Sequence, residues 1–184
     1  MLALRETGPI WLSIALGCIG ASIWRHSGRR LRRAHSGIRG ERDVALTLGR
    51  WAIVAYGWSP PGSRYDVDVV VTWPTIAAIE VKHATGRVRT RRDGTVAVDG
   101  ALLPGAPVRQ AVRGAAAVRR HLELPEPVEA VLCITGMKQR PRWVESNGSS
   151  VAVCSRRHLR RVLERLPRTQ RRLACDLIAA LGDE

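Results

Sequence analysis

Residues 66–82 of the chain read DVDVVVTWPTIAAIEVK, and this segment decides the fold. It holds two apolar runs rich in β-branched residues, and Trp73-Pro74-Thr75 separates them. β-branched residues favour strands, and a short proline-containing break between two such runs is typical of a turn. We therefore predict a β-hairpin whose turn is centred on Pro74.

The charged residues of this hairpin are expected to meet on one face. Because side chains alternate along a strand, Asp66 and Asp68 share one face of the first strand. Glu80 and Lys82 share one face of the second strand. The turn places Asp68 opposite Glu80, and it places Asp66 opposite Lys82. Like charges roughly 5 Å apart on opposed strands are destabilising, and a divalent cation shared by Asp68 and Glu80 would offset that repulsion. Asp66 is the alternative to Asp68 as the metal ligand.

Length and charge bound the classes of function. The chain has 184 residues, is 45% hydrophobic and carries a formal net charge of +14, which suits one domain with an appendage. A strongly basic balance favours a polyanionic partner, either nucleic acid or an anionic membrane surface. Of the 30 basic residues only Lys82 and Lys138 are lysine. A lysine inside the acidic hairpin therefore indicates a site that needs a compact ammonium group.

The cysteines argue against a zinc site. Cys18, Cys133, Cys154 and Cys175 are widely spaced, without a C-x-x-C pair and without histidines at metal-ligand spacing. Cys133 and Cys154 lie in apolar runs typical of strands. We expect these two to be buried, reduced thiols of an intracellular domain.

The N-terminal segment resembles a membrane anchor in composition. Residues 8–24, GPIWLSIALGCIGASIW, carry no charge. As a helix they would be about 25 Å long at ~1.5 Å per residue, close to the ~30 Å hydrocarbon core of a bilayer. Trp11 and Trp24 lie near the two ends, and five arginines follow within residues 25–33. This pattern predicts a single-pass transmembrane helix in the cell membrane with the rest of the chain cytoplasmic. A buried N-terminal helix is the alternative.

The rest of the chain shows alternating helix and strand patterns. Apolar residues recur at spacings of three and four over residues 41–55, which predicts an amphipathic helix. Asp93-Gly94 predicts a second hairpin turn, and Pro107 suits the start of a helix. Further strands are predicted at 87–91, 95–98, 128–134 and 151–154, and further helices at 108–122, 155–166 and 169–181, with a polar loop from 135 to 148. The order predicts an α/β (α+β) domain with a mixed sheet flanked by helices.

Several residues in this order carry a family resemblance. They are Glu41 near the start of a helix, Asp68 in a strand, the E-x-K run Glu80-Val81-Lys82, and Gln110 opening the next helix. Together they resemble the PD-(D/E)xK nuclease superfamily. More narrowly the chain resembles the nuclease-related domain (NERD) family, through G-E-R at Gly40, an Asp followed by Val-Val, I-E-V-K, Gly86 and Gln110-Ala111. The resemblance spans about residues 38–136, and Val69 stands where that family often has His.

The resemblance implies a restriction-endonuclease-like sheet and Mg²⁺-dependent hydrolysis of phosphodiester bonds, in DNA rather than RNA. Mg²⁺ takes oxygen ligands and keeps several waters, so Asp68 and Glu80 would suffice as protein ligands. Lys82 would orient the attacking water or stabilise the charged transition state. The family adds Glu41 and Gln110 to the catalytic set.

Four arginines near the acidic residues in sequence are candidates for gripping the phosphate backbone, a contact that is non-specific and salt-dependent. They are Arg87, Arg89, Arg109 and Arg113. No small-molecule cofactor is expected. The predicted segments are a membrane anchor at 1–25, a basic linker at 26–39, the nuclease-related domain at 40–155 and C-terminal helices at 156–184. The alternative function is a non-catalytic basic module that tethers DNA or an acidic partner to the membrane.

Overall fold

The computed structural model describes residues 38–63, 66–91, 93–146 and 148–182. Arg39–Glu184 forms one compact unit. The anchor expected at residues 8–24 and the basic linker that follows it lie outside the described residues. Within the ranges that are described, no helix has both the length and the apolar character needed to cross a membrane.

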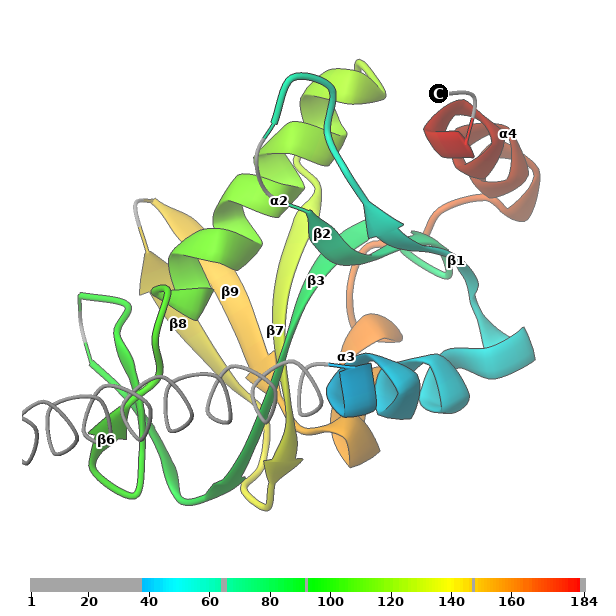
Figure 1. Cartoon of the computed structure of the whole chain (residues 1–184). Coiled ribbons are helices and arrows are strands. Elements are labelled where there is room, and N and C mark those ends of the chain that lie inside the picture. The colour runs from blue at the N-terminus through cyan, green and yellow to red at the C-terminus, as the bar shows by residue number, and fades with distance from the viewer. Residues whose placement is uncertain (1–37, 64–65, 92, 147, 183–184) are drawn as a thin grey trace, which may run out of the picture. The chain divides into compact units, whose positions relative to one another are not determined.

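A six-stranded mixed sheet lies at the centre of this unit (Figure 1). In spatial order its strands are β1 (Ile53–Trp58), β2 (Val67–Trp73), β3 (Ala77–Gly86), β7 (Glu129–Met137), β9 (Ser149–Cys154) and β8 (Arg142–Ser146). The middle strands β3, β7 and β9 are parallel, whereas β1, β2 and β8 run antiparallel to their neighbours. The fold is therefore a mixed α/β fold, as predicted.

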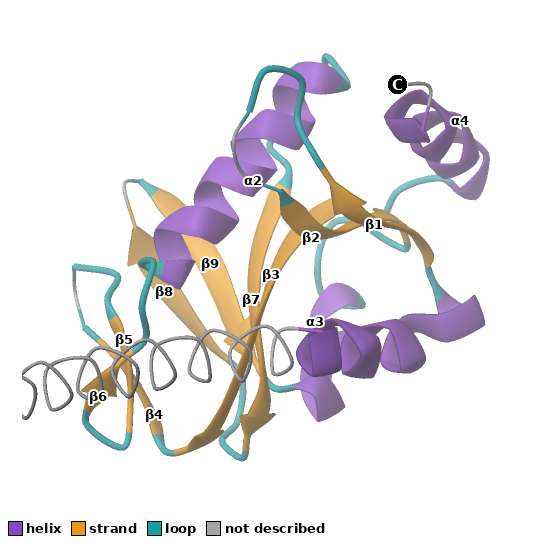
Figure 2. Ribbon diagram, in the orientation of Figure 1, coloured by secondary structure: helices purple, strands orange, loops and turns teal. Residues whose placement is uncertain are grey.

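Helices cover both faces of the sheet, and each face has its own apolar cluster (Figure 2). On one face α2 (Pro107–His121) packs through Val108, Ala111, Ala115 and Val118. On the other face the helix over residues 38–48 and α3 (Leu159–Leu163) pack through Val44, Leu48, Leu159 and Leu163. A sheet covered on both faces needs apolar side chains in both directions, which explains the uninterrupted Val69-Val70-Val71 run in β2.

The C-terminal helix α4 (Arg171–Gly182) packs against β1 and β2. The Thr72 hydroxyl donates a 3.0 Å hydrogen bond to the Ala174 carbonyl, so a buried polar group of β2 is satisfied by this helix. Leu181 extends the apolar cluster on the α2 face. The predicted terminal helix is therefore part of the domain.

A second, three-stranded antiparallel sheet follows β3. It consists of β4 (Val88–Thr90), β5 (Val96–Val98) and β6 (Ala101–Leu102). The predicted Asp93-Gly94 turn joins β4 to β5, and Asp93 accepts a 2.9 Å hydrogen bond from the Thr95 backbone. The Gln139 side-chain amide accepts from the Val88 N–H at 2.8 Å and donates to the Val88 carbonyl at 3.0 Å. One side chain thus links the small sheet to the turn after β7.

The helix predicted over residues 41–55 is wrong in its second half. The described helix ends at residue 48, a short 3-10 turn η1 (Gly49–Trp51) follows, and β1 begins at Ile53. Trp51, Ala52 and Val54 still pack against the same sheet face as the helix. Their burial produced helix-like spacing across a helix-to-strand junction, and the spacing alone could not distinguish the two.

Two further elements differ from the prediction. The polar loop expected between 135 and 148 contains β8, whose mixed sequence RWVES suits an edge strand with only Val144 and Ser146 buried. The helix expected over 155–166 is a 3-10 turn, η2 (Arg156–His158), followed by the short α3. The Ser155 hydroxyl bonds the His158 ring at 2.9 Å instead of capping the helix backbone.

Candidate active site

The hairpin of β2 and β3 has the predicted register. The paired residues are Val69 with Ile79, Val70 with Ala78, and Val71 with Ala77. Backbone pairing ends there, so Asp68 and Glu80 lie where the two strands begin to separate. At this point Asp68 Oδ2 accepts a 2.6 Å hydrogen bond from the Val81 N–H. A carboxylate takes the place that a backbone carbonyl of β2 would otherwise occupy.

Glu80 is held by two neighbours. Lys82 Nζ lies 2.5 Å from Glu80 Oε1, and the Glu80 side chain is only 8% exposed. The Gln110 amide, oriented with its nitrogen toward its acceptors, donates to Glu80 Oε1 and to the Gly105 carbonyl, each at 3.2 Å. Strand β3 and helix α2 therefore fix the same carboxylate from two directions.

The electrostatics of the site favour added positive charge. Burial raises the pKa of Glu80, and the charges of Asp68 and Glu41 raise it further, while the hydrogen bond and charge of Lys82 oppose the rise. Burial also raises the pKa of Asp68 against the Val81 hydrogen bond and the Lys82 charge. The charge of Lys82 alone does not offset the free-energy cost of keeping Asp68 and Glu80 ionised side by side.

Glu41 reaches this group from the helix over residues 38–48. Burial raises its pKa, the Asp68 charge adds to the rise, and the Lys82 charge opposes it. The approach depends on Gly40, because a Cβ there would lie 3.3 Å from Val81 Cγ1 and 3.5 Å from His83 Cβ. The absence of a side chain at residue 40 brings the start of the helix close to β3.

Gln110 reaches the site because α2 packs closely on the hairpin. One turn further along the helix, a Cβ at Gly114 would lie 3.3 Å from Val67 and 3.7 Å from Ala78. Val67 belongs to β2 and Ala78 to β3, so this glycine lets the helix axis approach both strands. We refer to Glu41, Asp68, Glu80, Lys82 and Gln110 together as the acidic site.

Asp66 does not take part in the expected pairing with Lys82. It precedes β2, is exposed, and accepts a 2.7 Å hydrogen bond from the Ser59 hydroxyl. Its charge still raises the pKa of Asp68 and Glu41. Of the two aspartates, Asp68 is the one in contact with β3.

The four arginines expected at the phosphate backbone are all exposed. Arg109 and Arg113 are exposed on α2, beside Gln110 and Gly114 that face the hairpin. Arg87 is exposed between β3 and β4, and Arg89 is exposed in β4. The predicted basic residues thus lie on α2 and at the start of the small sheet, and both elements contribute to the apolar cluster on one face of the central sheet.

The acidic site offers oxygen donors of the kind that a hard metal ion needs. Among the described residues, no three His, Cys, Asp or Glu side chains are grouped as a ready-made metal site. Asp68 and Glu80 offer carboxylate oxygens, the ligand type that Mg²⁺ prefers, and one or two carboxylates suffice because this ion keeps several waters. Their raised pKa values are lowered by any cation that binds between them. The acidic site therefore fits a hard divalent cation by its chemistry.

Sequence reasoning missed two residues that shape the site. The Val81 N–H, which fixes Asp68, left no sequence signal because every strand residue has such a donor. Gly114 did leave one, since a glycine inside a predicted helix indicates a packing or functional reason.

Cys133 and Cys154 are buried and free, as expected.

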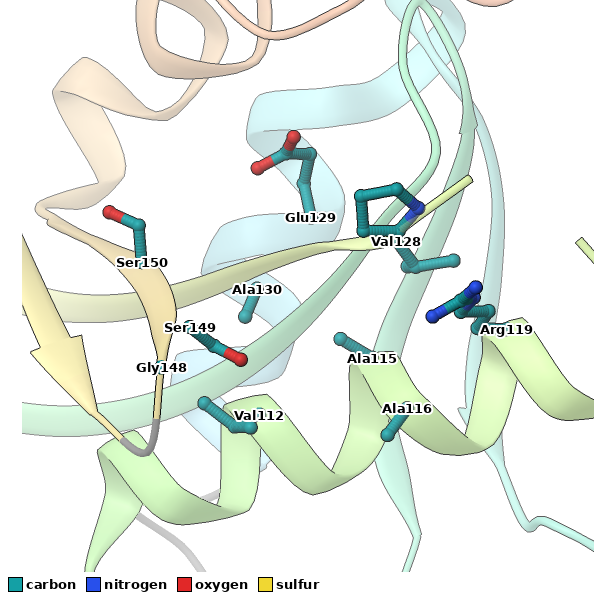
Figure 3. A pocket seen from close by; sticks show the side chains of 11 residues that line it. Val112, Ala115, Ala116, Arg119, Val128, Glu129, Ala130, Gly148, Ser149 and Ser150 are labelled. Atoms are coloured by element: carbon teal, nitrogen blue, oxygen red, sulfur yellow. The ribbon is translucent and has the colours of Figure 1, made fainter. Parts of the chain in front are cut away.

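A cavity of about 360 Å³ lies elsewhere, between α2 and the beginnings of β7 and β9 (Figure 3). Its lining includes Val112, Arg119, Glu129 and Ser149, and none of the acidic-site residues. Burial raises the pKa of Glu129. Arg119 donates to the Leu124 and Pro125 carbonyls at 3.2 and 2.9 Å, so its guanidinium braces the turn after α2.

Comparison with known proteins agrees with the location of the acidic site. A family model described as nuclease-related domain (NERD) matches residues 36–135. The matched range contains all five residues of the acidic site and extends into β7. Neither the curated proteins nor the solved structures gave a match to the chain.

Proposed function

The chain belongs to the nuclease-related domain (NERD) family, and from this premise we propose that it is a nuclease-like domain on a restriction-endonuclease-like sheet that hydrolyses phosphodiester bonds of DNA. The observation that carries the proposal is the convergence of Asp68, Glu80 and Lys82 where β2 and β3 separate. Two carboxylates with raised pKa values and a lysine 2.5 Å from one of them suit phosphate chemistry.

Asp68 and Glu80 would hold a Mg²⁺ ion. When bound, such an ion polarises the scissile phosphate and lowers the pKa of a bound water. Gln110 keeps Glu80 oriented through its 3.2 Å hydrogen bond, and the Val81 N–H does the same for Asp68 at 2.6 Å. Preorganised ligands of this kind need no rearrangement at the moment of reaction.

Lys82 supplies positive charge to the developing negative charge on the phosphate. The Lys82 side chain is 30% exposed and lies on the strand face of Glu80, so a phosphate oxygen can approach it from solvent. Glu41 adds a third carboxylate from the helix side and strengthens the field that attracts a cation. Arg87, Arg89, Arg109 and Arg113 would bind the backbone of the nucleic acid without reading its sequence.

The proposal is tested by digestion of linear and circular DNA with the full chain, in Mg²⁺ and in EDTA. We expect cleavage in Mg²⁺ alone, and loss of cleavage in Glu80→Ala with DNA binding kept. Glu145→Ala is the matched control, because Glu145 is exposed on β8 at the far edge of the sheet. Cleavage by Glu80→Ala at the unaltered rate would refute the mechanism.

A non-catalytic module that tethers DNA or an acidic partner to the membrane is the second candidate. The observation in its favour is the 2.5 Å Lys82–Glu80 pair, which gives Glu80 a cationic partner from within the chain. Calorimetric titration with Mg²⁺ distinguishes the two candidates. A nuclease should bind Mg²⁺ and lose that binding in Glu80→Ala, whereas a tether should bind DNA without binding Mg²⁺ at Glu80.

The membrane anchor at residues 8–24 remains a proposal of its own, with the domain on the cytoplasmic side. It is supported by the uncharged run and the arginines that follow it. Retention of the full chain in the membrane fraction after alkaline carbonate washing would support it. Release into the supernatant would exclude it.

A further inference from the structure

Exposed basic side chains gather at the carboxyl end of β7, outside the acidic site. Two come from the turn between β7 and β8, one from η2 and one from α3, and η2 packs against β7. The four residues are Lys138, Arg140, Arg157 and Arg161. We call this set the β7-end surface. In Figure 1 the ends of β3 and β7 and the start of α3 lie at the same end of the sheet.

The four residues form one surface rather than scattered charges. The Arg157 guanidinium donates to the Lys138 carbonyl, which joins η2 to the β7–β8 turn. Three of these charges act on the His158 ring. Burial lowers its pKa, and the charges of Arg157, Arg161 and Arg140 lower it further. The charges of two separate segments, the β7–β8 turn and η2–α3, therefore act on one imidazole ring.

The charges of this surface differ from those of the neighbouring arginines, which have partners within the domain. The neighbouring Arg156 pairs with Asp43 at 3.2 Å. Arg160 donates to the Thr47 carbonyl at 2.6 Å and lies over the Trp51 ring. These two arginines hold α3 to the helix over residues 38–48. By contrast, the ion pairs of the described residues include none from the β7-end surface. Like charges held together without carboxylates cost stability, and a bound anion would remove that cost.

The surface connects with the acidic site along β3. Lys138 lines a shallow hollow together with Thr85, Gly86 and Arg87. Asp99 also lines it, but accepts a 2.7 Å hydrogen bond from the Arg87 backbone. Arg87 is five residues beyond Lys82, or about 16 Å along a strand that rises ~3.3 Å per residue. Duplex DNA carries a charge every ~1.7 Å of its axis, so a bound duplex would span this distance in about five base pairs.

We propose that Lys138, Arg140, Arg157 and Arg161 form a second contact for the phosphate backbone of nucleic acid, which holds the duplex after it leaves the acidic site. The inference rests on the proposed function for its ligand class. The observation that favours nucleic acid over anionic lipid is continuity, because the surface is joined through Arg87 and the hollow to the strand that carries Glu80 and Lys82.

The test measures the salt dependence of DNA binding by the full chain in EDTA. Arg140→Gln combined with Arg161→Gln removes two charges, and neither side chain makes a hydrogen bond or ion pair with another described residue. The control combines Arg120→Gln with Arg172→Gln, which removes the same charge from exposed positions in α2 and α4. Each neutralised phosphate contact contributes ~0.9 to the slope of log K against log salt. We expect the slope of the first variant to fall by about 1.8 and that of the control to stay unchanged.

Equal slopes for the unaltered chain and the first variant would overturn the inference, and so would an equal change in the control. A parallel assay measures binding to vesicles with and without phosphatidylserine. Loss of phosphatidylserine binding in the first variant, with the DNA slope unchanged, would assign the surface to lipid and reject the proposal. Because binding is measured without divalent ion, a chain that never cleaves DNA can still pass this test, and a chain that cleaves can fail it.

Discussion

Two ion pairs in the described part of the chain join the same kinds of charged group but lie in different surroundings. Lys82 and Glu80 are 2.5 Å apart, with side chains 30% and 8% exposed. Arg156 and Asp43 are 3.2 Å apart and 47% and 28% exposed. The first pair lies among other carboxylates on strands. The second joins η2 to the helix over residues 38–48 and has solvent on one side.

The difference distinguishes an ion pair in a functional site from one that only stabilises the fold. Asp68 and Glu41 push the pKa of Glu80 upward, so the Lys82–Glu80 pair leaves an excess of negative charge in a poorly solvated place. An exposed pair such as Arg156–Asp43 is complete in itself and contributes about 0.2–1 kcal/mol to stability. Changes to each pair should therefore affect different properties, activity for the first and stability for the second.

The largest effect is expected for Glu80→Gln, which keeps the size of the side chain and removes its charge. Loss of a metal ligand should lower the cleavage rate at least ~10³-fold, about 4 kcal/mol of transition-state stabilisation. Single-turnover cleavage of a labelled duplex measures it. A rate within tenfold of the unaltered protein would show that Glu80 is not a ligand.

The same variant should have the opposite effect on stability. The folded protein holds the Glu80 proton more tightly than the unfolded chain, so its stability falls as pH rises from about 4.5 through the raised pKa. Glutamine does not titrate, so the stability of Glu80→Gln does not fall for this reason as pH rises. Without metal, its Tm should exceed that of the unaltered protein by a few degrees at pH 8, and the two should converge at pH 4. A Tm below the unaltered value at pH 8 would contradict the assignment.

Next in size is Lys82→Arg, which keeps the charge and changes its shape. A planar guanidinium is larger and more dispersed than an ammonium, and the space beside Glu80 is limited by Gln110. We expect a ~10²-fold lower cleavage rate with unchanged DNA affinity. Cleavage and fluorescence-anisotropy binding assays separate the two. An active Lys82→Arg would mean that only the charge matters.

A smaller loss is expected for Gln110→Leu, which removes the hydrogen bond to Glu80 but leaves both carboxylates. Partners that orient metal ligands are typically worth ~10–100-fold in affinity or activity. Half-saturation of cleavage by Mg²⁺ should therefore shift to higher concentration. If the Mg²⁺ dependence does not move, Gln110 has no part in positioning Glu80.

The smallest effect is expected for Asp43→Asn, which breaks the second ion pair. Its cost should be within about 1 kcal/mol of unfolding free energy by urea denaturation, reduced at high salt. Cleavage should be unchanged. A large loss of activity here would remove the distinction between the two pairs.

The hairpin and the placement of its charges could be predicted from the sequence because both depend on local features. Pro74 fixes the turn, and strand alternation then determines which residues oppose each other, so the register around Val70 and Ala78 could be predicted. The nearness of Glu41 and Gln110 could not be predicted without a family resemblance. It depends on how closely two helices pack on the sheet, and that closeness is set by Gly40 and Gly114.

The missed strand β1 has a different cause. Val44, Leu48, Trp51, Ala52 and Val54 pack in the apolar cluster of one sheet face, so a helix, a turn and the start of a strand give spacing close to that of a longer helix, although Ala55 packs on the opposite face. The fold class survived this error because β1 lies at the sheet edge, next to β2, and changes neither the parallel centre nor the positions of the acidic residues.

The parallel pairing of β3 with β7 has a consequence for the order of folding. Ala77 pairs with Glu129, so this contact closes a long loop that includes the small sheet and α2, whereas β2 and β3 meet across a short turn. Closing long loops is slow relative to forming hairpins. Asp68, Glu80 and Lys82 should therefore come together early, and Gln110 should arrive only with the late docking of α2. Pulsed hydrogen exchange during refolding, with β2 amides protected before those of β7, would report this sequence of events.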